Sequence, residues 1–188
     1  MILFPKNSFL FPLIIFIIII AFLSVGCSDS DVVPKKIEDS LDVSKVPDQM
    51  GWDVEVMFFD SSRTKAILNA RKASVFNDRM ETVLEGGIRV EFMSKTSGKR
   101  VSLLTANSAV VDDKTRDMLA RGNVVVISDS TNTRLETELL KWDNATQKLY
   151  STEFVTITSP LEKLQGYGFE SDQTLTNYTI KRVRGEQR

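Results

Sequence analysis

The sequence predicts an all-β protein, an open and curved antiparallel roll of roughly ten strands. Three observations predict it. No proline occurs between Pro47 and Pro160. Over that stretch Val, Ile, Thr, Phe and Leu alternate with polar residues, which is the period of a strand and not of a helix. The same pattern also returns along the chain at intervals of about 30 to 36 residues, which is typical of a repeat built from one supersecondary unit.

The first element, residues 1–26, is predicted to be a lipoprotein signal peptide or a membrane anchor. Lys6 is its only charged side chain, and a nearly continuous apolar run extends from Phe9 to Val25. At roughly 17 residues this run is long for a signal peptide and marginal for a bilayer span of about 20. The small residues before Cys27 resemble a bacterial lipobox, in which the cysteine is lipidated. A lipidated Cys27 and an uncleaved helical anchor both remain open.

The second element, residues 27–48, is predicted to be a flexible tether. It is acidic and polar, contains Pro34 and Pro47, and lacks a sustained apolar period. Such a composition cannot bury enough apolar surface to fold on its own. An extended tether of about 20 residues reaches at most ~70 Å. It would hold the third element, a β domain at residues 49–188, well clear of a membrane surface.

Composition excludes several classes of function. The chain has 24 Lys and Arg against 25 Asp and Glu. It therefore lacks the basic excess of a nucleic-acid binder, and we expect no nucleic-acid partner. The absence of histidine removes His-dependent nucleophile triads and His-rich zinc sites. Cys27, as the single cysteine, can form neither an intrachain disulfide nor a metal cluster. No metal site and no cofactor are predicted.

Within the β domain, residues 67–92 align with residues 103–128 without a gap. A third copy occupies residues 134–158 and a fourth begins at Leu164. The alanine position of the first two copies is taken by Thr137 in the third copy and by Gly166 in the fourth. The aligned pairs in the first two copies are Ala70 with Ala106, Gly86 with Gly122, Ile88 with Val124 and Val90 with Val126.

Each copy consists of a strand, a polar turn, a second strand and a connection to the next copy. The turns have the sequences FNDR, VDDKTR, WDNAT and ESDQT, whose Asp and Asn residues bond the local backbone and tolerate left-handed conformations. Residues 112–120 could pass as a helical turn, but strand patterns flank them on both sides. One copy cannot bury its apolar face alone, so stacked copies are expected to share one interior.

A stacked sheet of this kind leaves an unpaired strand at each end, which can accept a strand from a partner. The predicted edge strands are residues 52–59 and 176–183. The residues nominated for partner contact are Trp52, Val54, Val56 and Phe58 at the first edge and Thr176, Tyr178, Ile180 and Val183 at the second. Lys181, Arg182 and Arg184 can equally be interpreted as charges that protect the edge.

Over residues 46–185 the sequence resembles the LptC family. The segments that carry the resemblance are VPDQ, LLTANSAVVDDKTRDMLARGNVVV, LETELLKWD and LQGYGFESDQTLTNYTIKRVRG. The resemblance implies an OstA-like β-jellyroll, or twisted-boat roll, tethered to the inner membrane with its domain in the periplasm. It also implies lipopolysaccharide as the cargo, held by its lipid A acyl chains. An LptB-F-G-like ABC transporter of the inner membrane would meet the first edge, and an LptA-like bridge protein would meet the second.

Carrying such a cargo requires a dry channel. Each methylene removed from water is worth ~0.8 kcal/mol, so an acyl chain of about a dozen carbons costs on the order of 10 kcal/mol to leave wet. Alternation along the strands nominates an inward-facing set for a lipid-binding groove. It comprises Val54, Val56, Phe58, Leu68, Ala70, Ile88, Val90, Phe92, Leu104, Ala106, Val124, Val126, Leu135, Val155 and Ile157. Small residues at Ala70, Ala106 and Gly166 are expected to leave room for the ligand. The alternative is that these residues pack against one another as an ordinary core.

Two other classes of function are compatible with parts of this sequence, an enzyme and a structural module. Paired carboxylates, such as Asp112 with Asp113 and Glu136 with Glu138, can support acid–base catalysis. They fall in turns or on outward positions, so we interpret them as solvated charges and expect no catalysis. A lipoprotein adhesion or structural module that binds no lipid would share the anchor, the tether and the repeats.

Overall fold

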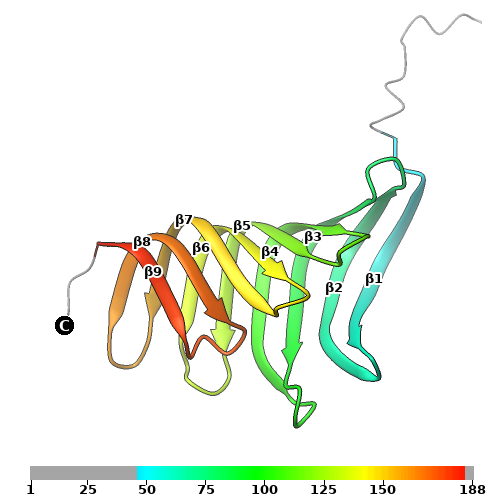
Figure 1. Cartoon of the computed structure of the whole chain (residues 1–188). Coiled ribbons are helices and arrows are strands. Elements are labelled where there is room, and N and C mark those ends of the chain that lie inside the picture. Colours follow the sequence, from blue (N-terminus) through cyan, green and yellow to red (C-terminus); the bar gives the residue numbers. More distant parts are fainter. Residues whose placement is uncertain (1–45, 185–188) are drawn as a thin grey trace, which may run out of the picture. The chain divides into compact units, whose positions relative to one another are not determined.

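Nine antiparallel strands follow one another in chain order across one sheet (Figure 1). The computed structural model describes residues 46–184, so the predicted signal or anchor segment, Cys27 and nearly all of the predicted tether lie outside the described residues. The strands are β1 (Gln49–Asp60), β2 (Arg63–Phe76), β3 (Glu81–Met93), β4 (Arg100–Asp112), β5 (Met118–Ser128), β6 (Arg134–Asp143), β7 (Lys148–Thr158), β8 (Lys163–Asp172) and β9 (Tyr178–Arg184).

The predicted all-β open roll is confirmed. The sheet has nine strands, where roughly ten were predicted. Residues 113–117 form the turn that connects β4 to β5, and Asp112 accepts hydrogen bonds from its backbone. No helix within residues 46–184 is long and apolar enough to cross a membrane.

The four polar segments predicted as turns all connect paired strands. In three of them the last residue of the strand is an aspartate that accepts hydrogen bonds from the turn backbone. Asp112 Oδ1 accepts from the N–H groups of Lys114 and Thr115 at 2.8 and 2.7 Å. Asp143 Oδ1 accepts in the same way from the N–H group of Thr146, and Asp172 Oδ1 accepts from that of Thr174. A residue with left-handed backbone lies in each turn, and these residues are Met80, Arg116, Gln147 and Leu175.

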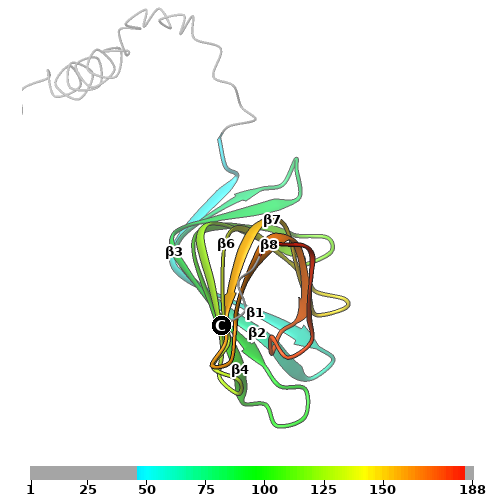
Figure 2. The ribbon, with the colours of Figure 1, turned by 90° about the vertical axis from the view of Figure 1, so that its left-hand side faces the viewer.

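A line of β-bulges crosses the sheet near the middle of the strands. The register between β3 and β4 shifts between Glu85 and Ile88, and corresponding shifts occur in the pairings from β2–β3 to β7–β8. Gly86 lies on this line with φ of 86°, and a Cβ there would be 2.7 Å from the Cβ of Arg71. Gly122, its predicted repeat equivalent, has φ of 75°. Bulges bend strands, so the line acts as a crease along which the sheet folds (Figure 2).

The crease divides the sheet into two parts that we call the first limb and the second limb. The strands pass through both limbs. The first limb contains residues 54–59, 64–70, 88–93, 100–106, 124–128, 134–137, 154–158 and 163–167. The second limb contains residues 49–52, 72–76, 81–85, 108–112, 118–121, 139–143, 148–151 and 169–172. Strand β9 pairs with β8 in both.

The inner faces of the two limbs pack on each other to form the core. Trp142 of the second limb is fully buried. Its ring centroid lies 5.1 Å from that of Phe58 and 5.5 Å from that of Phe92, both on the first limb. The limbs therefore meet again at the ends away from the crease. We call this line of contact the seam.

Candidate functional site

The residues nominated for the groove all lie on the inner face of the first limb, where cross-strand pairing arranges them in three rows. The row next to the crease contains Val54, Ala70, Ile88, Ala106, Val124 and Val155. The middle row contains Val56, Leu68, Val90, Leu104, Val126, Leu135 and Ile157. The row at the seam contains Phe58 and Phe92, which are joined by Ala66 between them.

These residues form one apolar cluster. Val54 and Val56 are half-buried and pack against it, and the other nominated residues are buried within it. The opposite wall is the inner face of the second limb, and none of its residues is among those predicted for the groove. Its large apolar members are Leu84, Met118, Leu140, Trp142, Leu149 and Phe169. Gly86 and Gly122 inside strand patterns were the available signal, because such glycines mark bulges at which a strand changes direction.

The expectation that Gly166 leaves room for a ligand is wrong. A Cβ at this position would collide with the carbonyl oxygen of Arg182 and would lie 2.6 Å from Cγ2 of Ile180. Both residues belong to β9, which pairs with β8 at Gly166. The glycine is required because another strand approaches closely, so its missing side chain provides no vacancy. Ala70 and Ala106 are likewise buried in the core.

The seam is closed by polar contacts as well as by the aromatic ones. Near β2, Lys65 Nζ donates to the carbonyl oxygen of Asn144 at 3.2 Å. In the middle, Ser102 Oγ donates to the carbonyl oxygen of Gln173 at 2.5 Å. Each contact joins the first limb to a turn at the end of the second limb. The interior of the roll is therefore shut along its length by the protein's own residues.

The last seam contact, near β9, is a hydrogen bond from Tyr178 Oη to Glu162 Oε1 at 2.6 Å. Burial raises the pKa of Tyr178 to about 12, and the bond to the Glu162 carboxylate adds to the increase. Beside it, Leu161 in the β7–β8 loop is 89% exposed. A cavity of about 820 Å³ opens here, lined by Thr131, Thr133, Ser159, Pro160, Leu161, Glu162 and Tyr178. This cavity lies beside the seam at its β9 end, outside the closed interior.

The first edge of the sheet is apolar on its outer face. Within the described residues β1 pairs with β2 alone. Trp52 and Phe59 are 64% and 56% exposed, and Met50 and Met57 are exposed beside them. Val54, Val56 and Phe58, which were also nominated for this edge, face the interior instead. The edge thus offers free backbone groups together with apolar side chains.

The second edge is basic. Strand β9 pairs with β8 alone within the described residues, and its exposed residues include Lys181, Arg182 and Val183. The Arg182 guanidinium lies 5.3 Å from the ring centroid of Tyr167. Two nominated residues, Tyr178 and Ile180, are half-buried against the core. The predicted start of this edge is corrected: Thr176 belongs to the turn, whose backbone is held by Asp172.

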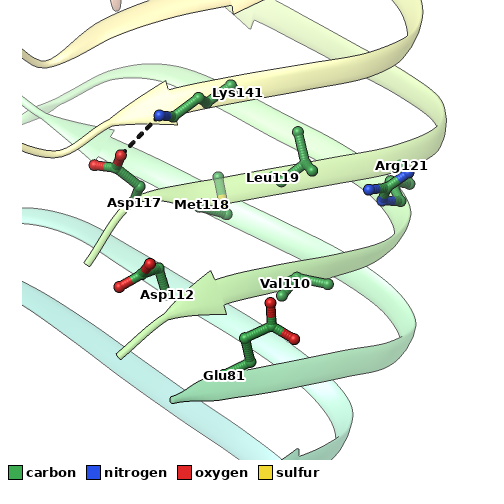
Figure 3. Close-up of a pocket in the computed structure, with 8 residues that line it drawn as sticks. All are labelled: Glu81, Val110, Asp112, Asp117, Met118, Leu119, Arg121 and Lys141. Atoms are coloured by element: carbon green, nitrogen blue, oxygen red, sulfur yellow. Dashed lines mark ion pairs between the residues drawn. The ribbon is translucent and has the colours of Figure 1, made fainter. Parts of the chain in front are cut away.

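A recess on the outer face contains several charged groups (Figure 3). It measures about 410 Å³ and is lined by residues of β3 to β6 and the connection before β5. Asp117 binds Lys141 Nζ at 2.9 Å, which raises the pKa of Lys141. The hydrogen bond from the Thr115 backbone lowers the pKa of Asp112. Both carboxylates therefore have structural partners.

The other paired carboxylates are engaged in the same way. Asp113 accepts from Thr82 Oγ1 at 3.0 Å. Glu136 pairs with Arg134 at 2.8 Å, and Glu138 accepts a backbone hydrogen bond from Asn123. No group of three or more Asp, Glu, His or Cys side chains within residues 46–184 could hold a metal ion.

Comparison with known proteins gives one family and one structural neighbour of note. The model of the family described as lipopolysaccharide-assembly, LptC-related matches residues 13–187. The crystal structure of LptH from Pseudomonas aeruginosa, described as the LptA-homologous periplasmic component of a lipopolysaccharide transport device, is similar at 13% identity and a TM-score of 0.49. The similarity covers 62% of this chain and 82% of that one. No curated protein sequence matches the chain.

Proposed function

This chain belongs to the family of LptC-related lipopolysaccharide-assembly proteins, and from that premise we propose that it takes lipopolysaccharide into the interior of its roll and passes it on. In the proposal an LptB-F-G-like ABC transporter of the inner membrane delivers the cargo and supplies the energy. An LptA-like bridge protein receives it. The chain itself performs no catalysis.

In this proposal the segments that precede the sheet also have roles. Residues 1–26, or a lipidated Cys27, hold the chain at the inner membrane. Residues 27–48 act as the tether, and residues 49–188 form the domain that binds lipid in the periplasm. Lipidation of Cys27 is tested by the mass of the mature protein, because a diacylglyceryl cysteine at the N-terminus and an intact residues 1–26 differ by far more than the measurement error.

The observation that carries the proposal is the continuous apolar inner face of the first limb. Its middle row extends from Val56 in β1 to Ile157 in β7 without a charged residue. A path of this kind lets an acyl chain move along the roll without meeting water at any step, which avoids a large desolvation penalty. The same residues pack against the second limb when no ligand is present.

Because the seam is shut, we infer that cargo enters by separation of the two limbs about the crease. The polar contacts to be broken lie at the seam, for example the hydrogen bonds from Lys65 and Ser102, and the apolar contacts between the two inner faces must be broken with them. The bulges at the crease interrupt the ladder of hydrogen bonds, so bending there costs less than bending an uninterrupted sheet. The acyl chains would then replace contacts that the limbs make with each other.

The inward-facing positions can be tested by crosslinking during active transport. A small aliphatic diazirine amino acid replaces Val90, Val126 or Ile157, so that the buried volume changes little. These positions are expected to capture lipopolysaccharide. Outward positions Arg89 and Lys141, which pair with Glu91 and Asp117 on the surface, serve as controls. Equal capture by the controls would contradict the proposal.

The edges are proposed to bind the two partners by strand addition. Deleting residues 176–188 is expected to abolish capture of the bridge protein, but it also uncovers Phe169, which is buried against β9. Single prolines in β9 are a cleaner test. Backbone N–H groups of an edge strand point alternately to the neighbour and to solvent. A proline that removes a solvent-facing N–H group breaks no bond to β8, so it should leave the melting temperature unchanged. Such variants should lose capture of the bridge protein, because its strand would need those N–H groups. If they retain it, β9 is not the binding edge.

The packed interior favours a second candidate, a rigid module that binds no lipid. The observation behind it is that Trp142, Phe92 and Leu104 have no exposed surface. Delipidated full-length chain titrated with lipopolysaccharide separates the two. Saturable binding that lipid A competes away supports the carrier. Absence of binding under conditions where the chain remains folded supports the rigid module.

A further inference from the structure

Four polar side-chain atoms are buried in the described interior without a hydrogen-bond partner. They are Nε1 of Trp142, Nε2 of Gln147, Oγ of Ser171 and Nε2 of Gln173. Each of the four residues is more than nine-tenths buried, with exposures of 0, 8, 2 and 6%. Unpaired buried polar groups are rare in native proteins because they lose their bonds to water, so each requires an explanation.

The four residues are neighbours. Trp142 pairs with Leu149, which pairs with Ser171 on its other side. Lys148 pairs with Asp172, and this register places Gln147 and Gln173 next to each other just beyond the ends of β7 and β8. On the first limb, Phe92 contacts Trp142. Ser102, the cross-strand partner of Phe92, donates a hydrogen bond to the carbonyl oxygen of Gln173. All four therefore line the interior directly beneath the seam.

The chemistry of this cluster is that of a donor site. Its unpaired atoms are three nitrogens, which donate and do not accept, and one hydroxyl oxygen. The buried polar residues around it, Ser102, Ser128 and Thr133, are also uncharged. An anion would need a cation to offset its charge, and a sugar hydroxyl would bring a donor of its own that the three unpaired nitrogens cannot accept. An ester or amide carbonyl is different, because its oxygen accepts without donating and it reaches an apolar interior attached to a hydrocarbon chain.

We propose that Trp142, Gln147, Ser171 and Gln173 form a subsite for the carbonyl oxygen of an ester- or amide-linked acyl chain. The inference rests on the proposed function in one respect, that the limbs separate to admit such a chain. The subsite fixes how deep the chain inserts. The hydrocarbon lies against the rows of the first limb, and its carbonyl stays beneath the seam with the polar headgroup outside.

The test compares two lysophosphatidylcholines of equal chain length, one with an ester-linked acyl chain and one with an ether-linked alkyl chain. Full-length chain in amphipol is titrated with each by displacement of a fluorescent fatty acid. The wild type is expected to bind the ester about tenfold more tightly than the ether, as one additional hydrogen-bonded group would provide. The variant with Gln147→Met and Gln173→Met should lose that preference and bind the ether with unchanged affinity.

Two further variants complete the design. Gln165→Met removes a glutamine that bonds Thr156 away from the cluster and should keep the tenfold preference. Ser171→Ala changes little volume and should reduce the preference, so the inference remains testable if the double variant does not fold. Equal affinity of the wild type for ester and ether means that water alone satisfies the donors, and it overturns the subsite while the carrier function stands. If the wild type binds neither lysophospholipid but binds lipopolysaccharide saturably, the subsite is overturned and the carrier function stands. If it binds none of the three, both are overturned.

Discussion

The indole ring of Trp142 lies edge-on to the phenyl ring of Phe58, with centroids 5.1 Å apart and an interplanar angle of 89°. The two residues belong to β6 and β1, which four strands separate within the sheet. Their contact exists only because the sheet folds back on itself at the crease. It fastens the first edge strand to the far limb, so the edge proposed to meet the transporter is anchored in the core.

Replacing Trp142 with alanine is expected to destabilise the domain by about 3 to 5 kcal/mol, because it removes the largest buried side chain and leaves a cavity at the seam. The measurement is the free energy of unfolding in urea. Trp52→Ala is the matched control, since Trp52 is 64% exposed on the outer face of β1. It should change stability by less than about 0.5 kcal/mol. Similar losses in both variants would contradict the assigned packing.

Gly166→Ala is expected to loosen β9, because the added Cβ collides with the carbonyl oxygen of Arg182. Overpacking of this kind costs about 1 to 3 kcal/mol. Amide hydrogen exchange should accelerate in β9 and remain unchanged in β1. Gly98→Ala is the comparison, because a Cβ at Gly98 meets nothing within 4 Å and the strain that its φ of 65° imposes on alanine lies in the β3–β4 loop, away from β9. Unchanged exchange in β9 after Gly166→Ala would show that the strand tolerates the methyl group.

Tyr178 is expected to make stability sensitive to alkaline pH. Its pKa is raised from 10.0 to about 12 in the folded protein, so the unfolded state loses its proton first as the pH rises. The contribution of this group is complete below pH 10 and is lost as the pH rises through about 12. Urea unfolding across this range should show the decline in the wild type. Tyr178→Phe should remove that decline, and Tyr150→Phe should leave it in place.

Asp172 is expected to make stability sensitive to acid. Burial raises its pKa, but the hydrogen bonds from Thr174, Asn177 and Thr176 outweigh burial and lower it below 3.8. The folded state therefore prefers the carboxylate, and its contribution is present above the unfolded pKa and lost as the pH falls below it. Asp172→Ala should lose about 1.5 to 3 kcal/mol at pH 7 and flatten the acid dependence. Asp78→Ala, in the β2–β3 turn, should change stability little because Asp78 makes no side-chain hydrogen bond within the described residues.

Locking the seam is expected to stop transport. A disulfide between Ser102→Cys and Gln173→Cys joins the limbs where a hydrogen bond of 2.5 Å now joins them. Lipopolysaccharide capture by a crosslinker at Ile157 should fall at least tenfold when the pair is oxidised and recover after reduction. The control pair replaces Arg100 and Asp129, which form an ion pair at 2.8 Å within the first limb. If the locked seam still permits capture, cargo enters by another route.

Much of this fold follows from local pattern. Alternation of apolar and polar residues places the strands, and the aspartates that end β4, β6 and β8 predict their turns, because that chemistry operates within four residues. The alignment of Gly86 with Gly122 is also meaningful, since both have positive φ at the crease. Strand alternation likewise brings the nominated groove residues onto one face of one limb.

What the pattern could not provide are contacts through space. The alternation of Ile88, Val90 and Phe92 identifies the inner face only as far as the bulge before Ile88. Beyond that bulge the register shifts, so the same alternation does not predict the inner face of the second limb. Gly166 was interpreted as a vacancy because its neighbour, Arg182, is 16 positions away in the sequence. The unpaired donors at Gln147 and Gln173 are visible only once the turns have been placed beneath the seam.

Every strand of this sheet is adjacent to the strands that precede and follow it in the chain. The domain can therefore fold one hairpin at a time as the polypeptide emerges N-terminus first, with each hairpin completed before the next forms. The last strand to be added is β9, which is the shortest strand at seven residues. A short strand with a neighbour on one side only is expected to open more readily than the strands between two neighbours. The LptA-like partner proposed to pair with β9 would therefore stabilise the last strand that this chain adds to its sheet.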